Sequence, residues 1–154
     1  MPEGFTFGLA EERHIPSLTA MSRDLFTHSR YVFDEHFDTE KVNSFYSGWV
    51  EKSVRGQLDD ECWCLFDLHR PVAFCTLRYG KEKAANIGVL GLDDLYQGRG
   101  LGKRLLQCLF NQLLELDVKT LTVVTQGRNI PAQNLYQSVG FRTKATQLWY
   151  HKWC

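Results

Sequence analysis

Three glycines stand within five positions, directly before a leucine-rich run, in the stretch DLYQGRGLGKRLLQ at residues 94 to 107. Glycine has no Cβ, so a turn of this composition can aim several backbone N–H groups at one point, a geometry that binds anions. A helix that begins at the turn adds about half a positive charge, and Arg99, Lys103 and Arg104 add full charges. The stretch therefore predicts a pyrophosphate site, with a plain glycine turn and a solvated basic helix start as the alternative.

Two familiar nucleotide-binding patterns do not fit this turn. A GxGxxG motif beginning at Gly98 would need glycine where Lys103 stands, and a P-loop would need serine or threonine where Arg104 stands. What remains is Q-x-x-G-x-G at residues 97 to 102, followed by a helical pattern. Backbone N–H groups, rather than a nucleotide fingerprint, are thus the expected anion ligands.

The turn must be held by the elements around it, which the hydrophobic pattern predicts. Apolar residues three and four positions apart predict helices, and alternating apolar and polar residues predict strands. Such a mixture predicts the α/β (α+β) class, with a central, mostly antiparallel mixed sheet and helices on both faces. The expected elements are a strand over 5–9, a helix beginning near 15, a helix over 38–56, strands over 61–67, 71–80 and 85–92, a helix over 101–116, a strand over 118–126, a helix over 130–139 and a strand over 145–153.

Composition limits the kind of protein to which these elements belong. The 154 residues fit one domain, over residues 1–154, and 44% of them are hydrophobic. Lys plus Arg and Asp plus Glu both number 18, so there is no surplus of positive charge for a nucleic-acid partner. No basic leader and no uninterrupted apolar run long enough for a membrane helix is present, which argues against membrane insertion and for a cytoplasmic protein. Five cysteines, an odd number without a CxxC pair, argue for free thiols and against a metal site.

The strand, the Q-x-x-G-x-G turn and the leucine-rich helix together resemble the acetyl-coenzyme A signature of the GNAT N-acetyltransferases. A second element follows in the expected order, because residues 129 to 141 fit the family pattern N-x-x-A-x-x-L-Y-x-x-x-G-F. The order of elements is similar over the whole chain, while the diagnostic residues lie between about 85 and 141. The resemblance implies the GNAT acyltransferase fold, acetyl-coenzyme A (acetyl-CoA) as cofactor, and N-acetyltransferase activity.

The resemblance implies a role for each part of the cofactor site. The backbone at the end of the strand over 85–92 would pair with the amides of the pantetheine arm, while the side chains there belong to the core. Backbone N–H groups of the glycine turn would bind the pyrophosphate, and Asn129 would hold the pantetheine arm from the other side. Asn129 fits a helix N-cap equally well. The cofactor-binding residues so implied are Leu90, Gly91, Leu92, Gln97, Gly98, Arg99, Gly100, Leu101, Gly102, Lys103 and Asn129.

The resemblance also implies that Tyr136 is the general acid beside the thioester sulfur. A tyrosine at helical spacing from Ala132 and Gly140 is more often a core residue, so the catalytic role comes from the resemblance alone. A leaving thiol has a pKa of about 8.5 and tyrosine one of about 10, so complete proton transfer would cost roughly 2 kcal/mol. We therefore expect Tyr136 mainly to donate a hydrogen bond that strengthens as negative charge develops on the sulfur.

Within the family, four stretches are similar to the dTDP-fucosamine acetyltransferases, which acetylate a 4-aminosugar carried on a nucleotide. They are RYVFDEHF, FYSGWVEKSVRGQLDD, VVTQGRN and ATQLWYHK. The similarity implies a small-molecule primary amine as acceptor, an aminosugar nucleotide such as dTDP-4-amino-4,6-dideoxygalactose. Cations for its pyrophosphate and rings for its sugar or base would come from side chains that otherwise form a solvated surface. The candidates are Arg30, Tyr31, Tyr46, Arg55 and Arg78.

Three classes of function stay open on the sequence: a small-molecule acetyltransferase, a protein or peptide N-acetyltransferase, and a non-catalytic acetyl-CoA sensor. Tyr136 argues against the sensor, which has no need of a proton donor. The strand over 85–92 contains no carboxylate. This absence favours an acceptor amine with a pKa well below that of lysine, because such an amine needs no strong base. A homodimer is compatible with the sequence.

Overall fold

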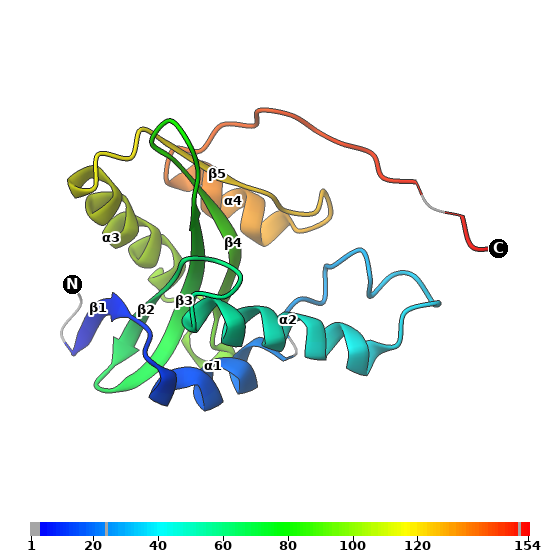
Figure 1. Ribbon diagram of the computed structural model, residues 1–154, viewed down its shortest axis with the longest axis horizontal. Coiled ribbons are helices and arrows are strands. Elements are labelled where there is room, and N and C mark those ends of the chain that lie inside the picture. Colours follow the sequence, from blue (N-terminus) through cyan, green and yellow to red (C-terminus); the bar gives the residue numbers. More distant parts are fainter. Residues whose placement is uncertain (1–3, 24, 151) are drawn as a thin grey trace.

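A computed structural model describes residues 4–23, 25–150 and 152–154, and it contains a five-stranded sheet flanked by helices (Figure 1). Every predicted strand and helix up to residue 138 is present, with small differences in the bounds. The elements are β1 (Phe5–Leu9), the short 3-10 helix η1 (Glu12–His14), α1 (Ile15–Ser22), α2 (Thr39–Val54), β2 (Glu61–Asp67), β3 (Arg70–Tyr79), β4 (Ala84–Leu92), the 3-10 helix η2 (Asp94–Tyr96), α3 (Leu101–Glu115), β5 (Thr120–Val123) and α4 (Ile130–Ser138).

The sheet is mixed and mostly antiparallel, as predicted. Its strands lie in the order β1-β2-β3-β4-β5, and each of the first four is antiparallel to its neighbour. Only β4 and β5 are parallel, and their pairing runs from Ala84↔Thr120 to Ile87↔Val123. Because β4 continues to Leu92, its second half extends beyond the end of β5.

Helices cover both faces of the sheet, which also confirms the prediction. On one face, Leu18 of α1 and Val50 of α2 are fully buried against the sheet residues Cys64 and Phe74. On the other face, α3 and α4 share a core with the strands, which includes Tyr136 of α4. The sheet is thus the middle layer of three, and a site on β4 is accessible to side chains from either outer layer.

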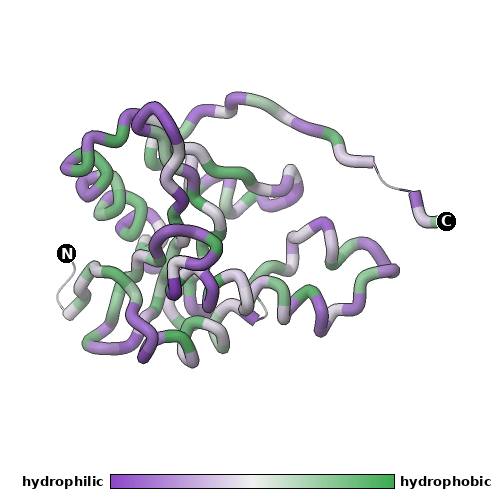
Figure 2. Tube along the Cα trace, in the orientation of Figure 1, coloured by the Kyte–Doolittle hydropathy of each residue, from purple (hydrophilic) through white to green (hydrophobic). Residues whose placement is uncertain are grey.

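The helix α3 shows why the leucine-rich run folds as it does. Its buried side chains include Leu101, Leu105, Leu109 and Leu113, which recur every four residues and so lie on one face. Hydrophilic and hydrophobic positions consequently alternate around the turns of this helix (Figure 2). No helix in the described part of the chain is both long enough and apolar enough to cross a membrane.

The strand predicted over 145–153 is wrong for the residues described there, and residue 151 lies outside them. Residues 145–150 and 152–154 belong to no strand, and the segment runs away from the sheet after α4 (Figure 1). Leu148, Trp149 and Tyr150 are between 70% and 88% exposed. The alternating pattern fits an extended chain, but a strand also needs a hydrogen-bonded neighbour, which the described residues of this segment lack. The strand predicted over 118–126 is likewise shorter, covering only Thr120–Val123.

All five cysteines are free thiols, in agreement with the prediction from their number. Cys62 and Cys64 of β2 are buried in the core on one face of the sheet, and Cys75 of β3 is buried in the core on the other face. A hydrogen bond to Cys62, and then burial, raise the pKa of the Cys64 thiol well above its ordinary value, and burial does the same for Cys75. These thiols therefore act as small core residues rather than as nucleophiles.

Candidate active site

The glycine turn lies between η2 and α3 and has the backbone geometry that its composition predicts. Gly98 and Gly100 both have φ at +73°, in the left-handed region that L side chains rarely adopt. Gly100 is the N-cap of α3, and no side chain caps the helix there. Among the described residues, the N–H groups of residues 101–103 have no hydrogen-bond partner. They are free donors at a helix N-terminus, which is what an anionic group requires.

Charged and close-packed groups surround this turn. The Arg99 guanidinium lies 5.2 Å from the ring centre of Tyr96. Arg104, in the first turn of α3, has a buried Nε with no hydrogen-bond partner in the described structure. Gly102 lets α4 come close, because a Cβ there would lie 3.2 Å from Leu135. Free N–H groups at a helix start, with Arg99, Lys103 and Arg104 close to them in sequence, fit a pyrophosphate, so the residues present suit the group that the sequence predicts.

Beyond the last β4–β5 pair, one edge of β4 is not covered by β5. The pairing stops at Ile87↔Val123, so the N–H and C=O groups of Gly88–Leu92 that face β5 have no ladder partner in that strand. The side chains of Leu90 and Leu92 pack into the core beneath α3 and α4, in agreement with the prediction. This edge leads toward the glycine turn, and it can pair with a linear group that carries amides.

Tyr136 lies in the layer of α4, with 9% of its surface exposed. Its ring packs edge-on against Phe141, with ring centres 5.5 Å apart. Burial, and to a smaller extent the Cys75 thiol, raise the pKa of Tyr136 to about 12. The hydroxyl group forms no hydrogen bond with the described residues, so it is a protonated donor without a partner.

Asn129 is the N-cap of α4, as its position predicts. Its side-chain oxygen accepts a hydrogen bond of 3.2 Å from the N–H of Ala132. The oxygen is thereby engaged, which leaves the Nδ2 group as the donor that could reach a ligand. Contact of Asn129 with a cofactor stays a prediction.

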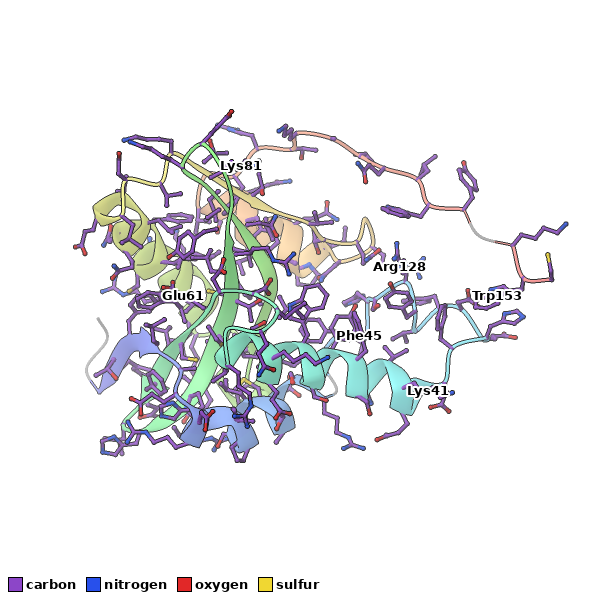
Figure 3. The ribbon with its side chains drawn as sticks, viewed as in Figure 1. Lys41, Phe45, Glu61, Lys81, Arg128 and Trp153 are labelled. Carbon is purple, nitrogen blue, oxygen red and sulfur yellow. The ribbon has the colours of Figure 1, made fainter. Side chains whose placement is uncertain are left out.

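A pocket of about 480 Å³ lies beside the loop that joins α1 to α2, and it contains one predicted acceptor residue. Arg30 lines it, and the guanidinium group donates a 2.7 Å hydrogen bond to Tyr31 and lies 4.8 Å from the ring centres of both Tyr31 and Trp149. Arg128 and Trp153 also line it, beside the same loop (Figure 3). The lining residues are Arg30, Phe33, Asp34, Glu35, His36, Arg128 and Trp153.

Of the five predicted acceptor residues, Arg30 lines this pocket and Tyr31 contacts Arg30, while the other three lie elsewhere. The Tyr46 hydroxyl donates to Ser29 Oγ at 2.8 Å. Arg55, at the end of α2, forms ion pairs with Glu12 and Glu51. Arg78 forms an ion pair of 2.9 Å with Asp59 and donates to the carbonyl of Leu58. Structural contacts thus occupy the two arginines, and a role in acceptor binding stays a prediction for each of the three residues.

Arg128, Phe33 and Trp153 are pocket residues that the sequence analysis missed. The Arg128 guanidinium lies 3.7 Å from the ring centre of Phe33, which joins the loop before α4 to the loop before α2. The available signal was the position of Arg128 directly before Asn129, in VVTQGRN. Together with Asp34 and Glu35, the arginines give the pocket both signs of charge.

Known proteins are similar to this chain in sequence and in fold. Residues 20–141, which include the glycine turn, the free edge of β4 and Tyr136, match the model of the Acetyltransferase (GNAT) family. The dTDP-fucosamine acetyltransferase of Escherichia coli O6:H1 is 29% identical over 145 residues, which cover 94% of this chain and 62% of that protein. The spore coat polysaccharide biosynthesis protein SpsD of Bacillus subtilis is 24% identical over 99% of this chain and 52% of its own length.

A solved structure has the same fold. The PaiA N-acetyltransferase of Thermoplasma acidophilum, in complex with coenzyme A, is similar at a TM-score of 0.76 and 15% identity, over 93% of this chain and 92% of that one. The chain spans less than two thirds of each of the two curated relatives. Because the family model covers most of the sequence and both of its motifs, the chain belongs to the GNAT family of acetyltransferases.

Proposed function

We propose that this GNAT acetyltransferase transfers an acetyl group from acetyl-CoA to the amine of an aminosugar nucleotide, such as dTDP-4-amino-4,6-dideoxygalactose. The observation that carries the proposal is the mixed charge of the pocket lined by Arg30, Arg128, Asp34 and Glu35. A relative that covers 94% of the chain is named a dTDP-fucosamine acetyltransferase, which supports the same class of acceptor.

The cofactor would be held by backbone groups along one continuous path. Acetyl-CoA supplies the acetyl group as a thioester. Free N–H groups of residues 101–103, together with the nearby charges of Lys103 and Arg104, would bind its pyrophosphate. The uncovered edge of β4 at Leu90–Leu92 would pair with the pantetheine amides, and the Nδ2 group of Asn129 would donate to the arm from the opposite side.

Tyr136 would donate a hydrogen bond to the sulfur of the leaving thiol. With a pKa of about 12 for the hydroxyl and about 8.5 for a thiol, complete proton transfer from Tyr136 is uphill by about 5 kcal/mol. A hydrogen bond meets no such barrier, and it strengthens as negative charge develops on the sulfur. Because the hydroxyl has no partner among the described residues, no existing hydrogen bond needs to be broken.

The acceptor would use both signs of charge in the pocket. The guanidinium groups of Arg30 and Arg128 suit the oxygens of a diphosphate, and the exposed ring of Phe33 suits a sugar or base. The carboxylate of Glu35 suits an ammonium group, while that of Asp34 already accepts hydrogen bonds from His36 and Trp153. A lysine side chain carries no phosphate, so it would offer no anion to either guanidinium group.

A comparison of two acceptors tests this assignment. The unchanged protein is assayed with dTDP-4-amino-4,6-dideoxygalactose and with the same aminosugar without its nucleotide, and then the Arg128→Ala variant is assayed. We expect the nucleotide to lower KM by at least about tenfold, and Arg128→Ala to remove most of that difference. The control is Arg13→Ala, in η1, which alters an exposed arginine outside the pocket. Equal KM values for the two acceptors would overturn the nucleotide part of the proposal.

A further inference from the structure

A β-bulge interrupts β4 at the point where β5 leaves it. Cys75 pairs with Leu90 and Leu77 with Ile87, so only Thr76 lies opposite two residues of β4, Gly88 and Val89. A bulge of this kind bends its strand and breaks the regular ladder. The last β4–β5 pair, Ile87↔Val123, comes directly before it. The bulge therefore marks the beginning of the uncovered β4 edge.

A side chain replaces the missing ladder bond in the bulge. The N–H of Val89 donates to Thr76 Oγ1 at 3.0 Å, and Thr76 donates its own hydroxyl proton to Asp59 Oδ2 at 2.5 Å. Thr76 is fully buried, and Asp59 is 2% exposed. Since a buried N–H group needs an acceptor, the Thr76 hydroxyl keeps Val89 in its bulged conformation.

Asp59 fixes the direction of that hydroxyl. It comes from the loop between α2 and β2, and its carboxylate accepts hydrogen bonds from Trp49 Nε1 at 2.6 Å and from Ser53 Oγ at 3.4 Å. Arg78 forms an ion pair with its other oxygen. These contacts satisfy a buried charge and leave Thr76 one orientation, with its proton toward Asp59 and its lone pairs toward Val89.

Gly88 provides the space for this arrangement. A Cβ at this position would overlap the Oδ2 atom of Asp59 and would lie 2.7 Å from Thr76 Oγ1. The carboxylate thus occupies the place that a side chain of β4 would fill. Asp59, which is distant in sequence, thereby contacts β4 at Gly88, one position after the last β4–β5 pair at Ile87.

We propose that Asp59 and Thr76 are positioning residues for acetyl transfer: they hold the β4 bulge, so that the edge at Gly88–Leu92 presents its N–H and C=O groups in one conformation. The inference rests on the proposed binding of the acetyl-CoA arm along this edge, and it does not depend on which amine accepts the acetyl group. Their effect on the reaction is geometric, because an edge displaced by about 1 Å misaligns the thioester.

The test compares three sheet variants. Thr76→Val keeps the shape but removes the hydroxyl, and Asp59→Asn keeps the shape but removes the charge. Thr122→Val is the matched control, because the Thr122 hydroxyl accepts a 2.9 Å hydrogen bond from Asn86 in the paired half of β4. Amide exchange at Val89 by NMR, acetyl-CoA affinity by calorimetry, and kcat with dTDP-4-amino-4,6-dideoxygalactose are measured for each, well below its melting temperature.

We expect Thr76→Val and Asp59→Asn to speed amide exchange at Val89 and to lower kcat by about 10- to 100-fold. Acetyl-CoA affinity should fall by a smaller factor than kcat, because the pyrophosphate contacts are untouched and only the pairing of the pantetheine arm is disturbed. Thr76→Ser should restore both exchange and kcat, and Thr122→Val should change neither.

Three results would overturn the inference. They are unchanged exchange at Val89 in Thr76→Val, kcat within about twofold of the unchanged protein in both variants, and an equal loss of kcat in Thr122→Val. If Thr76→Val does not fold, Asp59→Asn and Thr76→Ser decide the question by the same readouts. If the unchanged protein does not acetylate the nucleotide sugar, the proposed function fails, while the exchange measurement still decides whether these residues hold the bulge.

Discussion

Tyr136 is the proposed hydrogen-bond donor to the leaving thiol. The residue is buried, and its hydroxyl is protonated and has no hydrogen-bond partner in the described structure. Tyr136→Phe should leave acetyl-CoA affinity unchanged and lower kcat by about 10² to 10⁴, the range for a positioned acid. Stability should change little, since no hydrogen bond to a described residue is lost. Calorimetry and steady-state kinetics check this, and an unchanged kcat would return Tyr136 to a purely structural role.

The raised pKa of Tyr136 also predicts how stability depends on pH. Its pKa is about 12 in the folded protein and about 10 in the unfolded chain, so the unfolded chain loses its proton first as the pH rises. The resulting stabilisation is fully present below pH 10 and is lost between about pH 10 and 12. At pH 11 the loss amounts to about 1.4 kcal/mol.

Urea unfolding at pH 9 and pH 11 measures this effect. Between these two values, the unchanged protein should lose about 1.4 kcal/mol more than Tyr136→Phe. Tyr150→Phe is the control, because Tyr150 is 88% exposed. Equal losses in the unchanged protein and in Tyr136→Phe would contradict the burial of this hydroxyl.

Single residues differ in how well the sequence predicts them. The glycines and Tyr136 lie in local patterns, and their local structure depends on neighbours a few positions away. The sequence pattern did not predict a role for Asp59, because its contacts with Thr76 and Gly88 depend on three segments that come together only in the folded sheet. A residue whose role comes from distant neighbours has no spacing by which a single sequence reveals it.

At the scale of the elements, the glycine turn before α3 is the clearest target. Gly100→Val should reduce acetyl-CoA affinity by at least about 100-fold, because a β-branched residue is strained at φ +73° and cannot keep the N–H groups converged. Gly56→Val is the matched control, since Gly56 has φ +65° at the end of α2. Calorimetry on the folded variants measures both, and an unchanged affinity in Gly100→Val would show that the turn does not bind the cofactor.

Asn129, at the start of α4, has two functions that can be separated by substitution: its side-chain oxygen caps the helix, and its Nδ2 group is the proposed donor to the cofactor. Asn129→Asp keeps an oxygen to cap the helix but removes the Nδ2 donor, whereas Asn129→Ala removes both. Thermal unfolding should show a loss of about 0.5 to 2 kcal/mol in Asn129→Ala and almost none in Asn129→Asp. Weaker acetyl-CoA binding is expected in both, and full affinity in Asn129→Asp would leave Asn129 only as a cap.

Elements were predictable where the pattern is long and the partner lies nearby. The helix over 101–116 has a buried leucine every four residues, and the strands over 61–67 and 71–80 form a hairpin, so each prediction is close to the structure. The strand over 145–153 failed because alternation predicts extension without supplying a neighbouring strand. The β4 bulge could not be predicted from the sequence either, since it depends on the register of β4 against β3.

At the scale of the whole molecule, the proposed site joins the two outer layers across one strand. The layer of α3 and α4 would contribute the free N–H groups, Asn129 and Tyr136, while the layer of α1 and α2 would contribute Arg30 and the side chains that surround Asp59. The net charge of zero did not predict the charged pocket, because positive and negative side chains lie together in it and cancel in the total. Acetyl donor and amine would thus meet at the uncovered edge of β4.

The most direct test of the proposed function is the pH dependence of kcat/KM for two acceptors, dTDP-4-amino-4,6-dideoxygalactose and a lysine peptide. No residue of β4 is a carboxylate, so the acceptor should be an amine with a pKa of about 7.7 to 8, which is roughly half to two thirds neutral at pH 8. We predict that the nucleotide sugar is preferred by more than about tenfold and that its profile levels off near pH 8. A profile that still rises beyond about pH 9, with the peptide preferred by more than about tenfold, would contradict the account and identify a protein acetyltransferase.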